Sequence, residues 1–221
     1  MKTYKILVFS ICFFNLSFSQ NSEIGNWFIY FGNQKINQNW NLHSEIQYRN
    51  YDFIGDTNQI LVRIGIGYNL KENNNNILIG YGFINTHKYI ANSDQKQESN
   101  EHRIFQQFIT KQNFGRFYFL HRYRMEERFL PDDFQLRLRY FLGINIPLNK
   151  RKLEKNSIYL STYNEIFVNT KNTLFDRNRI YAGLGFVINK NCKVETAIMA
   201  QKTNQINRNQ FQIAIFNNLP F

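Results

Sequence analysis

The chain has 221 residues, of which 17% are aromatic and only three are proline, and its formal net charge is +11 at pH 7. This length suits a single domain. The negative mean hydropathy is unusual for a helical membrane protein but natural for the alternating strands of a barrel. In an exported protein the basic balance indicates contact with anionic lipid or an anionic solute, or simply surface charge. We expect no nucleic-acid partner, because no stacking-aromatic motif or phosphate-cradling glycine loop accompanies the charge.

The N-terminus has the features of an export signal. Lys2 and Lys5 precede an apolar run at residues 6–14, and small residues follow that run. This order predicts a secretory signal peptide at residues 1–19, which leaves residues 20–221 as one exported domain. The run is too short to cross a bilayer, which takes about 20 apolar residues.

Eleven stretches of the chain alternate apolar and polar residues with the period of two that is typical of a β-strand. Residues 117–129 show the pattern most completely, because Phe117, Tyr123 and Phe129 share one parity while Arg122 and its neighbouring arginines have the other. A helix would mix these arginines and aromatic residues around its axis. The predicted strands are residues 27–34, 40–51, 60–68, 77–87, 101–112, 117–129, 135–146, 158–169, 179–188, 192–201 and 210–221.

The predicted connections alternate in length, as short turns and longer loops do in outer-membrane barrels. We expect mostly shorter ones near residues 35–38, 70–76, 113–115, 148–156 and 189–191, and mostly longer ones near 51–58, 88–100, 130–134, 170–177 and 202–207. Bacterial single-chain barrels have even strand numbers. We therefore expect either ten strands, with residues 27–34 too short to count, or twelve, with one strand missed.

Alternation alone does not separate a membrane barrel from a soluble β protein, whose strands also alternate. Charge placement favours the membrane, because all six aspartates lie in predicted loops, few lysines touch a strand, and the mid-strand charges are Arg and Glu. Such charges can pair in a confined interior. Aromatic residues also gather near strand ends or on the apolar face, as interface girdles require. These residues are Trp27, Trp40, Tyr48, Tyr68, Tyr81, Tyr89, Phe117 and Phe129.

The chain ends on Phe221, which shares its parity with Phe211, Ile213 and Ile215. A last strand with a terminal aromatic residue resembles the assembly signal of outer-membrane barrels. We therefore predict an all-β fold, a single antiparallel up-and-down transmembrane β-barrel of ten or twelve strands in the outer membrane. Its expected partners are outer-membrane lipid and the barrel assembly machinery. A secreted soluble β-barrel that binds a ligand is the alternative.

Short charged motifs recur along the predicted strands. They are Glu101-His102-Arg103, Arg122-Tyr123-Arg124-Met125-Glu126, Arg137-Leu138-Arg139-Tyr140, Glu165-Ile166-Phe167-Val168-Asn169 and Arg177-Asn178-Arg179. With these motifs the chain, roughly from Gly25 to Phe216, resembles the domain of unknown function 2490 (DUF2490) family of exported proteins. The resemblance implies an outer-membrane barrel fold, and it carries over no activity and no catalytic residue.

Thirteen charged residues have the parity of the predicted barrel interior. They are Glu45, Arg49, Arg63, Glu101, Arg103, Arg122, Arg124, Glu126, Arg137, Arg139, Glu165, Arg179 and Glu195. Arg and Glu pair through bidentate hydrogen bonds, so our first interpretation is a salt-bridge lattice that fills a narrow, structural barrel. The second is a narrow, anion-preferring pore for small solutes, because eight arginines face five glutamates and charged rings set the preference of a pore. A barrel of about ten strands is only slightly wider than one of eight, which favours the first.

An outer-membrane barrel enzyme that acts on lipid or peptide is the competing class of function. His43 has the parity of Glu45 and Ser161 faces the predicted lumen, but His121 lies on the apolar face. A catalytic His–Ser pair needs contact at about 3 Å. The sequence does not place the strands of His43 and Ser161 side by side, and we expect no enzyme. Loss of the signal peptide would leave Cys192 as the one cysteine, and no carboxylates or histidines repeat at ligand spacing. We therefore expect no metal and no cofactor.

Overall fold

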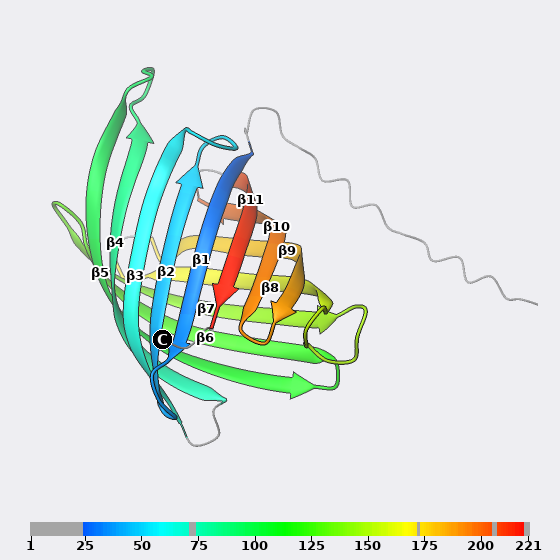
Figure 1. Ribbon diagram of the computed structural model, residues 1–221. Coiled ribbons are helices and arrows are strands. Elements are labelled where there is room, and N and C mark those ends of the chain that lie inside the picture. The colour runs from blue at the N-terminus through cyan, green and yellow to red at the C-terminus, as the bar shows by residue number, and fades with distance from the viewer. Residues whose placement is uncertain (1–23, 71–73, 172, 205–206, 219–221) are drawn as a thin grey trace, which may run out of the picture.

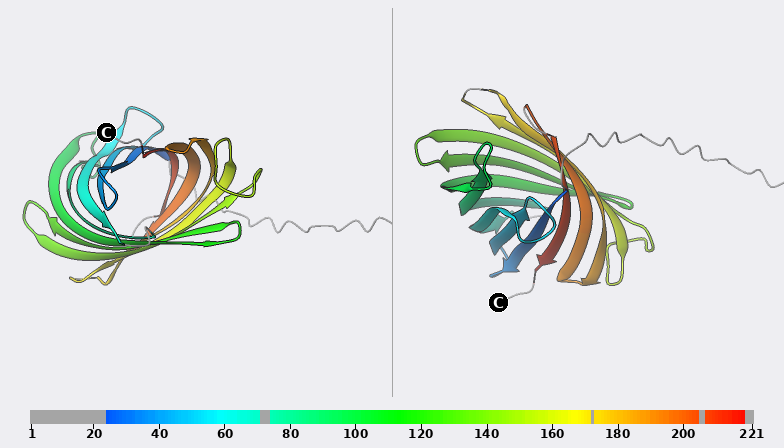
Figure 2. Two further views of the ribbon diagram at one scale, coloured as in Figure 1. Left: turned by 60° about the horizontal axis from the view of Figure 1, so that its bottom comes forward. Right: turned by 90° about the horizontal axis from the view of Figure 1, so that it is seen from above.

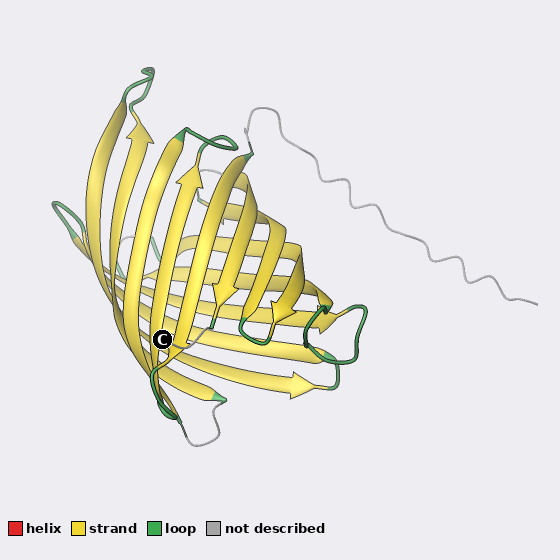
Figure 3. Ribbon diagram, viewed as in Figure 1, coloured by secondary structure: helices red, strands yellow, loops and turns green. Residues whose placement is uncertain are grey.

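The computed structural model describes residues 24–70, 74–171, 173–204 and 207–218. Within these ranges every regular element is a β-strand (Figure 3), as the sequence predicts. The predicted signal peptide at residues 1–19 and the terminal Phe221 lie outside the described residues.

Eleven strands close into one barrel, in which consecutive strands are neighbours (Figure 1). The strands are β1 (Gly25–Lys35), β2 (Trp40–Asn50), β3 (Thr57–Asn69), β4 (Asn75–Tyr89), β5 (Lys96–Phe114), β6 (Phe117–Phe129), β7 (Phe134–Pro147), β8 (Ile158–Asn169), β9 (Phe175–Asn189), β10 (Cys192–Thr203) and β11 (Asn207–Asn217). All eleven predicted strands are found, and the predicted bounds of β6 and β8 are those of the structure. The period of two is therefore sufficient to locate every strand of this barrel.

The strand number is eleven, so the expectation of ten or twelve is wrong. The first strand is a full member of the barrel, because β1 pairs with β2 on one edge and with β11 on the other. β1 and β11 run parallel, from Gly25 opposite Gln210 to Gly32 opposite Asn217, whereas consecutive strands pair antiparallel. Consecutive strands of an up-and-down barrel reverse direction, so an odd number can close only through one parallel pair. The expectation of a wholly antiparallel barrel is therefore wrong at the β1–β11 seam.

The connections alternate in length as predicted, except at the one between β7 and β8. Much of the polar segment at residues 88–100 is strand, because β4 continues to Tyr89 and β5 begins at Lys96, and this hairpin rises above its neighbours in Figure 1. Pairing between the two strands satisfies the main-chain hydrogen bonds whatever the side chains are, so polar residues do not end the ladder. The connection at residues 148–157, predicted among the shorter ones, is longer than the one at residues 90–95.

The two faces of the sheet are sorted by polarity, with the apolar face outward. On β3, Ile64 is 52% exposed while its neighbour Arg63 is 4% exposed. The same pattern recurs around the barrel, and Figure 2 looks into its interior. A soluble β-barrel directs its apolar face inward, so the polarity of this barrel is reversed. The outward apolar residues include Ile46, Ile60, Val62, Ile66, Ile77, Ile79, Leu138, Ile180, Leu184 and Ile198.

Aromatic side chains and glycines on adjacent strands pack together inside the barrel. Phe105 on β5 lies opposite Gly80 on β4, and Tyr159 on β8 lies opposite Gly185 on β9. A Cβ atom at Gly80 would lie 2.4 Å from Cζ of Phe105, and one at Gly185 would lie 2.1 Å from Cζ of Tyr159. Carbon atoms do not approach so closely in a packed interior, so each ring needs a glycine beside it.

Trp27 lies inside the barrel, not in the outward aromatic girdle that the sequence predicts for it. Its side chain is 5% exposed, and the guanidinium carbons of Arg49 and Arg179 lie 3.9 and 5.0 Å from the centre of its ring. These are cation–π contacts. Trp40, by contrast, lies on the outer face and is 41% exposed. Trp27 and Phe28 are adjacent aromatic residues, so alternation alone does not decide which of them points outward.

Candidate functional site in the barrel interior

Glu126 on β6 is the most deeply buried charge among the described residues, at 0% exposed. Its arginine neighbours within 4 Å are Arg63, Arg103, Arg124, Arg137 and Arg139. Arg137 and Arg139 each donate a hydrogen bond to one of its two oxygens. A buried carboxylate is costly unless it is paired and hydrogen-bonded, and the surrounding arginines fulfil both conditions. Glu126 is therefore the centre of a charge network that extends from β3 to β7.

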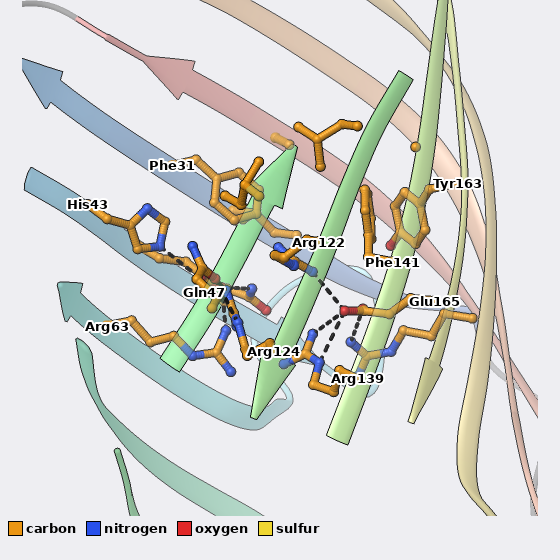
Figure 4. Close-up of a pocket in the computed structure, with 18 of the residues that line it drawn as sticks. Phe31, His43, Gln47, Arg63, Arg122, Arg124, Arg139, Phe141, Tyr163 and Glu165 are labelled. Atoms are coloured by element: carbon orange, nitrogen blue, oxygen red, sulfur yellow. Dashed lines mark hydrogen bonds and ion pairs between the residues drawn. The ribbon is translucent and has the colours of Figure 1, made fainter. Parts of the chain in front are cut away.

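A second buried carboxylate, Glu165 on β8, shares Arg139 with Glu126. Nε and Nη2 of Arg139 donate to Oε1 of Glu165 at 3.1 and 2.6 Å, and Nη2 of Arg122 donates to the same oxygen at 2.7 Å (Figure 4). Arg179 on β9 lies 3.8 Å from the other oxygen. The shared arginine joins both carboxylates into one network.

Two further carboxylates extend this network. Glu45 on β2 accepts a hydrogen bond from Nη1 of Arg63 at 2.8 Å. Glu101 on β5 accepts hydrogen bonds from Nε of Arg103 and Nε of Arg128, both at 2.6 Å. Arg103 and Arg128 therefore share one carboxylate at this end of the interior, as Arg122 and Arg139 share Glu165.

Glu195 on β10 has a different environment. Tyr159 and Tyr181 donate their hydroxyl groups to it at 2.8 and 2.9 Å, and Ser161 donates at 3.1 Å. Lys193 lies 3.4 Å away, and among the described residues no arginine lies within ion-pair distance. The Ser161 hydroxyl is thus engaged by a carboxylate that hydroxyl donors already stabilise.

The cavity inside the barrel has a volume of about 810 Å³ and is lined by residues from all eleven strands. Twelve of the thirteen predicted interior charges line it, and Glu126 lies buried behind them. Counted over the described part of the chain, the lining carries ten arginines and three lysines against four carboxylates. The electrostatic potential in the cavity is therefore positive.

Besides the three lysines of the lining, three interior charges are absent from the sequence prediction. Arg128 and Arg177 line the cavity, and Asp176 lies 3.0 Å from Nη1 of Arg137. The parity of Arg128 is that of Arg122, so the alternation already contained the signal for it. The sequence prediction missed Asp176 because β9 begins at Phe175, four residues earlier than predicted. The expectation that every aspartate lies in a loop is therefore wrong for Asp176.

Three buried guanidinium nitrogens make no hydrogen bond within the described ranges. They are Nε of Arg63, Nε of Arg122 and Nη1 of Arg124. All three arginines line the cavity. A buried donor without an acceptor costs about 1–3 kcal/mol, so an acceptor that reaches one of these three N–H groups would stabilise it.

The groups considered for catalysis or metal binding have separate partners. Nε2 of His43 lies 3.5 Å from Glu45, and Nδ1 of His121, on the outer face, lies 2.9 Å from the Tyr140 hydroxyl. No hydrogen bond between described residues joins Ser161 to a histidine. The described ranges contain no group of three or more His, Cys, Asp or Glu side chains that could hold a metal ion. No helix in the same ranges is long and apolar enough to cross a membrane.

Comparison with known proteins places this barrel in a family. The sequence model of the family described as protein of unknown function (DUF2490) matches residues 24–212, which include all thirteen predicted interior charges. Searches of curated proteins and of solved structures returned no match. The family match covers most of the chain, from the start of β1 into β11. The chain therefore belongs to the DUF2490 family.

Proposed function

We propose that this protein is an outer-membrane β-barrel whose lumen admits small anions in preference to cations. The observation that carries the proposal is the reversed polarity of the barrel, with isoleucine, valine and leucine side chains outward and arginines inward. An apolar surface of this extent is unfavourable in water, and it is the surface that hydrocarbon requires. The strands have 11 to 19 residues, and a tilted strand needs about 9–11 to cross a bilayer.

The charge of the cavity lining supports the preference for anions. Thirteen basic side chains face four carboxylates across the described lining. Positive rings in a narrow passage attract anions and repel cations. The interior is lined from one rim to the other, from Asn76 and Lys111 near the β3–β4 and β5–β6 turns to Arg128 and Arg177 near the opposite connections.

A closed, purely structural barrel is the second candidate. The network around Glu126 favours it, because arginines from β3, β5, β6 and β7 converge there and hold the walls together. The cavity of about 810 Å³ beside this network argues against a completely filled interior. A measurement of ion conductance separates the two candidates.

The two tryptophans of the chain provide a test of membrane insertion. Trp40 lies on the outer face and Trp27 inside the barrel. In vesicles of brominated phosphatidylcholine, we expect strong fluorescence quenching in Trp27→Phe, which retains Trp40, and weak quenching in Trp40→Phe, which retains Trp27. Equally weak quenching in both variants would contradict insertion.

Ion selectivity tests the passage itself. In a planar bilayer with a tenfold KCl gradient, we expect the purified protein to give a reversal potential of the sign set by chloride. Arg122→Gln, inside the cavity, should reduce this potential, whereas Arg151→Gln, on an exposed turn, should leave it unchanged. Zero current would refute the passage and support the closed, structural barrel, and a reversal potential of the sign set by potassium would refute the preference for anions.

A further inference from the structure

Aromatic rings and an arginine meet in the part of the cavity shown in Figure 4. Phe141 on β7 and Tyr163 on β8 lie with ring centres 4.8 Å apart, and Figure 4 draws Arg122 between them and Phe31 of β1. The guanidinium carbon of Arg122 lies 4.6 Å from the centre of the Phe141 ring. All four side chains line the cavity. This part of the interior therefore combines flat apolar surfaces with a positive charge.

Two arginine side chains in this region each have a nitrogen that makes no hydrogen bond within the described residues. Nη2 of Arg122 donates to Glu165, but its Nε is buried without a hydrogen bond within the described chain. Arg124, two residues along β6, is 3% exposed, and its Nε and Nη2 donate to Oε1 of Gln107 at 2.9 and 2.7 Å. Its Nη1 makes no hydrogen bond to a described residue. Arg122 and Arg124 thus each have an N–H group without a hydrogen-bond acceptor among the described residues, and Nη1 of Arg124 lies 3.6 Å from Oε1 of Glu126.

On the opposite side of the cavity, the described residues of β1 and β11 contribute apolar side chains and no charged ones to the lining. Phe31 on β1 stacks on Phe216 of β11 with ring centres 5.0 Å apart, and Ile29 and Ala214 line the cavity beside them. The ten lining arginines come from β2, β3, β5, β6, β7 and β9. The arginines of β6 and β7 therefore face apolar side chains of β1 and β11 across the interior.

We propose that this interior binds an aromatic carboxylate. The carboxylate accepts hydrogen bonds from Nε of Arg122 and Nη1 of Arg124, which make none within the described residues, and the ring packs against Phe31, Phe141 and Tyr163. An arginine and a carboxylate make strong, charge-assisted hydrogen bonds, and aromatic rings gain further from stacking. The inference deepens the proposed anion preference by naming the ligand class.

The size of the cavity agrees with an organic ligand. Sites for small molecules have volumes of about 300–1,000 Å³ and combine apolar walls with a few placed polar groups. The cavity here, at about 810 Å³, falls within that range. An inorganic anion would use the arginines but leave the rings without a partner, so it should bind more weakly than an aromatic carboxylate.

The test is binding of 4-fluorobenzoate to the full, folded chain in a neutral detergent, followed by fluorine NMR. We expect saturable binding. The neutral analogue 4-fluorobenzyl alcohol should bind at least about tenfold more weakly, because it lacks the charge that pairs with arginine. Inorganic phosphate should displace 4-fluorobenzoate only at much higher concentration. Equal binding of the neutral analogue, or no saturation, would overturn the inference.

Matched arginine variants locate the site. Arg122→Gln removes one of two arginines that donate to Glu165, and Arg128→Gln removes one of two that donate to Glu101. Both variants leave the shared carboxylate with a partner, so both should fold. We expect Arg122→Gln to weaken 4-fluorobenzoate binding by about tenfold and Arg128→Gln to change it less than twofold. Equal losses would indicate a general effect of charge and no site at Arg122.

An aromatic variant completes the test. Phe141→Leu keeps an apolar side chain but removes the ring, and it should weaken 4-fluorobenzoate more than cyclohexanecarboxylate, which cannot stack. If 4-fluorobenzoate binds but the bilayer carries no current, the binding site is supported in a closed barrel and only the proposed anion passage is refuted. If the bilayer carries an anion-selective current but 4-fluorobenzoate does not bind, the proposed passage is supported and the binding site is refuted.

Discussion

Arg63 on β3 lies 3.5 Å from Glu126 on β6, although β4 and β5 separate their strands. The other nitrogen of its fork donates to Glu45 on β2 at 2.8 Å. One long side chain therefore connects carboxylates that lie on strands far apart in the sheet. Arginine suits this position because its planar fork can serve two acceptors at once.

Removal of the Glu126 charge should destabilise the barrel strongly. In Glu126→Gln, the five neighbouring arginines lose the charge that compensates them, and loss of one partner from a buried network costs about 3–5 kcal/mol. We expect a large shift in the urea midpoint of the protein folded in detergent. Glu154→Gln is the control, since Glu154 is exposed on a turn and pairs only with Lys150 at 3.1 Å among the described residues. A shift as small as that of the control would show that the network does not stabilise the fold.

Two interior glycines should not tolerate a methyl group. Gly185→Ala drives a carbon into the ring of Tyr159, and overpacking of this kind costs about 1–3 kcal/mol. Gly80→Ala meets Phe105 and should behave alike. Gly82→Ala on β4 is the matched control, because the nearest atom to its Cβ, Cγ of Arg63, would lie 3.1 Å away, farther than the ring atoms at the other two positions. Thermal unfolding should rank Gly82→Ala as the mildest, and any other order would contradict the packing.

The β1–β11 seam can be tested by disulfide formation in a Cys192→Ser background. Tyr30 and Ile215 lie opposite each other across the parallel pair, and adjacent strands are about 4.8 Å apart. Tyr30→Cys with Ile215→Cys should therefore cross-link readily, because this separation suits a disulfide. The mismatched pair Phe28→Cys with Ile215→Cys places the two Cα atoms about 8 Å apart and should cross-link poorly. The reverse result would place the register or the closure elsewhere.

The connection between β6 and β7 carries an exposed ion pair with a defined pH response. A hydrogen bond from Lys171, with a second from Gln135, holds the pKa of Asp133 below its ordinary value of 3.8. Because the folded pKa is the lower one, the contribution of this pair to stability is present above the unfolded pKa and is lost as the pH falls through the folded pKa. Lys171→Met should raise the pKa of Asp133 toward 3.8, as measured by carboxyl carbon NMR with Asp133→Asn for assignment. An unchanged pKa would show that the pair does not form in solution.

The sequence predicts the strands well because each strand carries its own signal. Residues 117–129 alternate so completely that their bounds need no tertiary information, and residues 158–169 behave likewise. The strand number fails for a different reason. Whether β1 pairs with β11 depends on how the whole sheet closes, and no local pattern in either strand records the direction of that pairing.

The identity of the interior residues is also local, but their partners are not. Parity places Arg122, Arg124 and Glu126 on one face of β6. The contact between Glu126 and Arg63 depends on the stagger of four strands and on side chains that cross the interior. The N–H groups of Arg122 and Arg124 that make no hydrogen bond among the described residues follow from the same geometry, so the sequence gives no sign of them.

The parallel β1–β11 seam has a consequence for the chain ends. Strands that run side by side in the same direction begin at one mouth of the barrel and finish at the other, so the start of β1 at Gly25 and the end of β11 at Asn217 open on opposite mouths. A bilayer around the barrel would therefore separate them. An epitope inserted just before β1 and another just after β11 would be reached from different compartments, and a protease added outside intact cells would remove only one of the two.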